Sequence, residues 1–91
     1  MRAQRFDFDA TVVSRLESGD GVLVAKLAMM ELAGGFGVSH PESSFTGPGV
    51  NQWDTSRWSE GSSSGSGSAV GAGLVTFAIG SETWGSILHP S

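Results

Sequence analysis

The sequence predicts an α/β fold, because segments of helix and strand composition alternate along it. Val22–Ala25 is a short apolar run of the kind that forms a strand buried on both faces, and Thr76–Ile79 is expected to be another strand. Helix-forming segments precede and follow the first run. Between Gly34 and Gly67 the chain is rich in glycine, serine and proline, which indicates a long loop.

The first helix is expected over Ala10–Glu17, where two valines and a leucine recur at helical spacing. Asp9 stands directly before this segment and is predicted to cap it, since aspartate is among the preferred N-cap residues. Gly19 or Gly21 is expected to end the helix.

A second helix is expected over Leu27–Leu32, which is rich in helix formers and is followed by Gly34. After the long loop, Ser66–Leu74 can form a third helix. Its glycines cost about 1 kcal/mol each relative to alanine, so close packing on a sheet is the expected compensation. Gly80–Gly85 is then expected to form a tight loop.

Composition limits both size and partners. Ninety-one residues allow one small domain, and a net charge of −4 with scattered basic residues argues against a nucleic-acid partner. The absence of cysteine excludes disulfides and thiolate metal sites. The longest apolar run, Ala69–Ile79, is too short to span a bilayer, and Met1–Phe8 lacks the apolar core of a signal peptide. We therefore expect a cytoplasmic protein without a membrane partner.

Two further sequence patterns are weak evidence for a catalytic or metal site. Gly61–Gly65 satisfies the G-x-S-x-G pattern of a nucleophile elbow, but such a match is expected by chance in a glycine/serine tract. His40 and His89 lie far apart, with no carboxylate at ligand spacing, and are interpreted as surface histidines. No metal and no cofactor are expected.

Four ordered segments carry a stronger signal. They are Leu23–Ala33, Asn51–Arg57, the glycine/serine run Gly61–Ala69, and Ile79–Ile87. A flexible linker has no reason to continue, as this run does, into a small-residue apolar stretch. Together with Asp9–Val13, these segments resemble the amidase signature, the defining segment of the amidase-signature family of serine hydrolases.

The resemblance implies a mixed β-sheet core flanked by helices, and a Ser–cis-Ser–Lys triad that needs no cofactor. By position, Ser86 is the nucleophile, and Ser62, held by a cis peptide bond, accepts its proton. Ser63 is expected in the same constellation and among the substrate-binding groups. An oxyanion hole, which stabilises the charge of the tetrahedral intermediate, is expected from the backbone N–H groups of Thr83, Trp84 and Gly85.

The third member of the triad is not identified in this chain. Lys26 is the only lysine, but its surroundings match a different lysine of the family, so it is interpreted as a structural residue with a solvated head. Residues 1–91 are therefore expected to form a partial amidase domain, without the catalytic-lysine segment and the C-terminal remainder. Glu82, Trp84 and Leu88 depart from the aspartate, glycine and arginine that are common at these positions of the family.

These observations favour an amidase that cleaves the C–N bond of a small-molecule amide through an acyl-Ser86 intermediate. The isolated chain is expected to be inactive, and its expected partner is the remainder of the amidase domain. The resemblance also allows a glutaminase-type subunit of a tRNA-linked amidotransferase. A different class stays open: a non-catalytic remnant or interaction module of the same fold, suggested by the missing base and the Trp84 and Leu88 substitutions.

Overall fold

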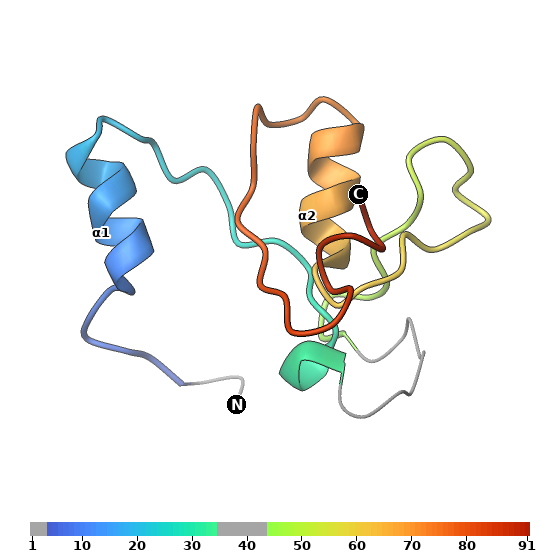
Figure 1. Ribbon diagram of the computed structural model, residues 1–91, viewed down its shortest axis with the longest axis horizontal. Helices are drawn as coiled ribbons and strands as arrows, with labels where there is room; N and C mark the ends of the chain where they lie inside the picture. The colour runs from blue at the N-terminus through green and yellow to red at the C-terminus, as the bar shows by residue number, and fades with distance from the viewer. Residues whose placement is uncertain (1–3, 35–43) are drawn as a thin grey trace.

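The computed structural model describes residues 4–34 and 44–91. These residues contain the α-helices α1 (Thr11–Ser18) and α2 (Ser64–Gly71) and the short 3₁₀ turn η1 (Glu31–Gly34). Figure 1 shows α1 at one end of the molecule, with an extended segment leading from it toward α2 and the C-terminal residues folded back beside α2. No helix in the described ranges has the length and apolar character needed to cross a bilayer.

The first predicted helix is confirmed, but its predicted cap is wrong. The N-cap is Ala10, which is extended (φ −63°, ψ 145°), and no side chain bonds to the first turn. Gly19 ends the helix as expected, donating its N–H to the carbonyls of Arg15 and Leu16. No residue of α1 is buried, and Val12 is 48% exposed. Val13 and Leu16 are half-buried, so the apolar stripe of this helix is only partly covered in the described chain.

The second predicted helix, Leu27–Leu32, does not form because distant residues use its backbone groups. The Met30 N–H donates to the Ser62 carbonyl at 3.0 Å, and the Ala28 carbonyl accepts the Gly65 N–H at 2.9 Å. These groups are therefore not paired within a helix. Only η1 remains, and its Leu32 has a left-handed backbone (φ 51°), which is unfavourable for a residue other than glycine.

The predicted strands Val22–Ala25 and Thr76–Ile79 have no ladder of hydrogen bonds. Over residues 4–34 and 44–91, the one β-bridge pairs Val50 with Trp58 in antiparallel register. A strand requires a neighbour to bind its N–H and C=O groups, and neither segment has one here. Val22 is 84% exposed rather than buried on both faces. An α/β fold with a mixed sheet stays a prediction for this sequence.

The third predicted helix is confirmed as α2, and small residues explain its packing. A side chain at Gly65 would collide with the backbone of Ala28, and one at Gly67 would collide with the carbonyl of Pro90. The helix therefore packs on extended chain and on the C-terminal turn, rather than on the sheet expected from the sequence. Buried residues around it are small or polar, except for the methionine: Met30, Gly49, Ser59, Ser62, Ser63, Ser64, Gly65 and Ala69.

Much apolar surface stays exposed around this small core. The accessible surface is 7282 Å², whereas a folded monomer of 9.4 kDa exposes about 5,000 Å². Exposed apolar side chains include both predicted strand segments, in particular Val22, Leu23, Val24, Phe77 and Ile79. An apolar surface of this extent is typical of a face that another polypeptide covers.

Replacing Gly65 with alanine tests the close approach of α2 to the Ala28 segment. The new methyl group would overlap the Ala28 backbone, so we expect the free energy of unfolding to fall by about 1–3 kcal/mol. Urea denaturation of the purified chain measures this change. Gly19→Ala is the matched control, because its added methyl would lie at ordinary contact distances of 3.5 and 3.6 Å, and a comparable loss there would contradict the packing explanation.

The exposed apolar surface predicts that the isolated chain binds the dye ANS and self-associates as its concentration rises. Fluorescence titration and light scattering across micromolar concentrations measure both effects. A chain that stays monomeric without binding the dye would show that this surface is not accessible in solution.

Candidate functional site

The Gly61–Ser62 peptide bond is cis, as the family resemblance implied. Met30 packs directly on this bond: its sulfur lies 2.6 Å from the position that a Cβ of Gly61 would occupy. Position 61 therefore has no room for a side chain. The Met30 N–H also donates to the Ser62 carbonyl, so the 28–34 segment covers Ser62 from one side.

The hydroxyl of Ser62 is buried and has no partner. The residue is 3% exposed, and its Oγ makes no hydrogen bond in the described part of the chain. Leaving a buried polar group unpaired costs about 1–3 kcal/mol, so proteins seldom keep one without a reason. This oxygen is chemically available to exchange a proton with a group brought to it.

Ser63 joins the start of α2 to the segment that carries Ser86. Its N–H donates to the Ser86 carbonyl at 3.0 Å, and its Oγ contacts the Ser81 N–H at 3.3 Å and the Ser81 carbonyl at 3.4 Å. Gly80 permits this approach, because a Cβ there would lie 3.0 Å from Ser63 Oγ. The structure thus brings the two predicted catalytic serines onto adjacent segments, which the Ser63 N–H joins through the Ser86 carbonyl.

The turn around Ser86 is bound to one carboxylate. Glu82 accepts the N–H groups of Gly85 at 3.1 Å, Ile87 at 2.7 Å and Leu88 at 2.9 Å. These bonds lower the pKa of Glu82 below its ordinary value of 4.5, with the Leu88 N–H as the largest cause and the Ile87 N–H next. Because the Gly85 N–H is bound to Glu82, it is not a free donor for an oxyanion in this conformation.

Gly85 is the one position of this turn that requires glycine. Its φ of +85° lies in the left-handed region, and a Cβ there would lie 2.5 Å from the His89 ring. The Trp84 side chain is 87% exposed and lines neither of the two principal cavities, and Thr83 is exposed as well. These two residues can therefore contribute backbone groups to the site, while their side chains lie in solvent.

Sequence reasoning missed the contact between Glu60 and His89. His89 Nδ1 lies 3.6 Å from Glu60 Oε2, so the residue before the cis bond pairs with a residue that follows Ser86. Twenty-nine positions separate the two along the chain, and no spacing rule relates them. His40 lies outside the described residues.

The Asn51–Arg57 motif forms a closed polar turn, and its Gln52 also lines a small cavity beside α2. The Asn51 N–H donates to the Arg57 carbonyl at 2.8 Å, and the Asp54 carboxylate accepts the Ser56 hydroxyl at 2.6 Å and the Arg57 Nε–H at 3.0 Å. The Ser56 hydroxyl is the main cause of a lowered Asp54 pKa. The motif therefore shapes its own loop through short-range bonds.

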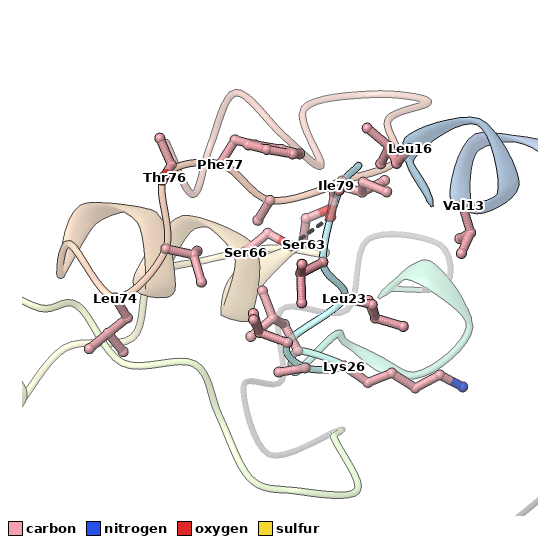
Figure 2. Close-up of a pocket in the computed structure, with 18 of the residues that line it drawn as sticks. Val13, Leu16, Leu23, Lys26, Ser63, Ser66, Leu74, Thr76, Phe77 and Ile79 are labelled. Carbon is pink, nitrogen blue, oxygen red and sulfur yellow. Dashed lines mark hydrogen bonds between the residues drawn. The ribbon is translucent and has the colours of Figure 1, made fainter. Parts of the chain in front are cut away.

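An apolar groove of about 780 Å³ runs between the two predicted strand segments. Residues 21–29 form one wall, residues 74–81 the other, and Ser63 and Ser66 line the floor (Figure 2). Lys26 lines the groove, but Figure 2 shows its side chain running outward, away from Ser63. Neither Ser62 nor Ser86 lines this groove or the smaller cavity of about 390 Å³ beside α2. Among residues 4–34 and 44–91, no three metal-binding side chains gather at one point.

Known proteins share this arrangement of segments in their sequences. The family model named Amidase matches residues 2–91. The A subunit of the glutamyl-tRNA(Gln) amidotransferase of Cupriavidus metallidurans is 51% identical over 84 residues, which cover 92% of this chain and 16% of that protein. The protein of the same name from Sulfurisphaera tokodaii is 45% identical over 84 residues, with coverages of 92% and 17%. That of Listeria welshimeri is 47% identical over 90 residues, with coverages of 97% and 18%.

The chain therefore spans about one sixth of the length of these curated relatives. No solved structure matches it.

Removing the Ser62 hydroxyl is expected to stabilise the chain, because the group is buried and unpaired. Ser62→Ala should raise the free energy of unfolding by about 1 kcal/mol, as measured by urea denaturation. Ser59→Ala is the matched control: its buried hydroxyl lies 3.0 Å from the Ser64 carbonyl and 3.2 Å from that of Gly49, so its loss should destabilise by about 1 kcal/mol. Equal losses in both variants would contradict the absence of a partner for Ser62.

Proposed function

Because this chain belongs to the amidase family, we propose that it carries the signature segment of a serine amidase, with Ser86 as nucleophile and Ser62 as its proton acceptor. In this mechanism Ser86 Oγ attacks the amide carbonyl carbon and passes its proton to Ser62. The C–N bond breaks as the amine leaves with a proton, and water then releases the acyl group. The cis Gly61–Ser62 bond and the hydrogen bond from Ser63 to the Ser86 carbonyl support this assignment.

Within this proposal, backbone donors of the Ser86 turn stabilise the oxyanion. Thr83, Trp84 and Ser86 keep N–H groups without an acceptor in the described part of the chain, whereas that of Gly85 is bound to Glu82. The oxyanion hole therefore uses these three groups first. Gly85 joins them only if its bond to Glu82 opens.

The base that completes the relay comes, in our proposal, from outside this chain. Lys26 is the only lysine, and its side chain runs away from Ser63. The unpaired hydroxyl of Ser62 marks the point where a neutral amine would accept the proton. The apolar groove between residues 21–29 and 74–81 is then covered by the remainder of a larger amidase domain, which supplies the neighbours that the two strand segments lack.

We propose a small-molecule amide as substrate and a cytoplasmic location. A role as part of the A subunit of a glutamyl-tRNA(Gln) amidotransferase is the second candidate, because the relatives of 45–51% identity carry that name. Trp84 and Leu88 distinguish this chain from the family pattern, so its acyl specificity is expected to differ. A non-catalytic interaction module is the alternative that the following experiment separates from both.

A chimera tests the proposal directly. The matched 84-residue segment of the Cupriavidus metallidurans protein is replaced by the corresponding segment of this chain, which restores the surrounding domain. We expect the chimera to hydrolyse simple amides and to react with a fluorophosphonate. Ser86→Ala should abolish both, because no acyl-enzyme can form. The isolated chain should show neither activity.

Ser18→Ala is the matched control, because Ser18 is an exposed serine of α1 whose hydroxyl bonds only to the Ser14 carbonyl. That variant should keep full activity. A well-folded chimera that binds amides without hydrolysing them would favour the non-catalytic module. Turnover by the isolated chain would show that the base lies within these 91 residues.

A further inference from the structure

We propose that Glu82 is the positioning residue that holds Ser86 in its reactive place, an assignment that rests on the proposed role of Ser86 as nucleophile. Its two carboxylate oxygens bind the N–H groups of Gly85, Ile87 and Leu88, which lie on both sides of Ser86. The Ser86 N–H is the one backbone donor in residues 85–88 that Glu82 leaves unbound. The carboxylate therefore fixes the turn and leaves the Ser86 N–H free to bind an oxyanion.

The opposite end of the Ser86 residue is fixed as well. Its carbonyl accepts the Ser63 N–H at 3.0 Å, and the His89 N–H closes the turn on the Gly85 carbonyl at 2.8 Å. Ser86 is thus held from the α2 side through its carbonyl and from the Glu82 side through its two neighbours. The Glu82 bonds fix the shape of the turn, and the Ser63 bond fixes its position relative to α2.

Positions 82 and 88, which both depart from the family pattern, are joined by a hydrogen bond. Arginine is common at position 88 in the family, but Leu88 has no charged side chain and cannot form an ion pair with Glu82. Glu82 instead accepts the Leu88 backbone N–H at 2.9 Å, which any residue at position 88 other than proline can donate. A charge-assisted bond to a backbone group is stronger than a neutral one, so this contact ties position 88 to the carboxylate without a charged side chain.

The charge of Glu82 makes this contact sensitive to pH. His89 is the other titratable group that acts on Glu82, and its positive form favours the carboxylate. The pKa of Glu82 is lowered in the folded chain, so its contribution to stability is fully present above the pKa of the unfolded chain. That contribution is lost as pH falls through the lower, folded pKa.

Nuclear magnetic resonance of the ¹⁵N-labelled 91-residue chain tests the proposal. In an acid titration, the amide signals of Gly85, Ile87 and Leu88 should move together with one midpoint below pH 4.5. Glu82→Gln should remove this shared transition and speed exchange of the Ser63 amide by about ten-fold or more, since the turn that carries its acceptor is released. Glu82→Asp keeps the charge and should retain the transition.

Glu17→Gln, on the exposed face of α1, is the matched control and should leave all four amides unchanged. Amides that titrate independently, or a shared transition that survives Glu82→Gln, would overturn the proposal. In the chimera, Glu82→Gln should lower kcat by about ten-fold or more with KM unchanged, because misplacing a reacting group mainly affects the chemical step. If the shared titration is found but a well-folded chimera that binds amides is inactive, the nucleophile assignment fails, whereas the binding of the turn by Glu82 is still supported.

Discussion

The hydrogen bond from the Ser63 N–H to the Ser86 carbonyl is the contact on which the rest of the site depends. It joins the start of α2, directly after the cis Gly61–Ser62 bond, to the turn that follows Gly80. Without it, the two serines would belong to separate loops of a chain that has little core. With it, a buried unpaired hydroxyl and the proposed nucleophile lie on neighbouring backbone.

Small residues make that junction possible. Gly61 leaves room for Met30, and Gly80 leaves room for Ser63, so backbone meets backbone where side chains would hold the segments apart. The resulting core is formed largely by serine hydroxyls and peptide groups, whose hydrogen bonds are specific in direction but contribute little net free energy. Such a core fixes the positions of its groups but buries little apolar surface, which agrees with the large apolar surface that stays exposed.

Two features of the structure lack a contact partner within the described residues. The groove between residues 21–29 and 74–81 has apolar walls without strand partners, and the Ser62 hydroxyl has no partner of its own. The larger amidase domain of our proposal would satisfy both at once, since it would add neighbours to the strand segments and a base to the proposed proton relay. Glu82 differs from these features, because its three hydrogen bonds are complete within the chain.

The sequence by itself determined the features that depend on near neighbours. Residues a few positions apart account for helix α1, its end at Gly19 and helix α2. The family signature follows from short local motifs that occur in a fixed order along the sequence. Tertiary structure decided where distant backbone groups pair: Ser62 and Gly65 use the groups of Met30 and Ala28 that a helix would have needed, and His89 meets Glu60. Local hydrogen bonds can be predicted from sequence spacing. Contacts between segments about thirty residues apart depend on the tertiary fold, which brings those segments together.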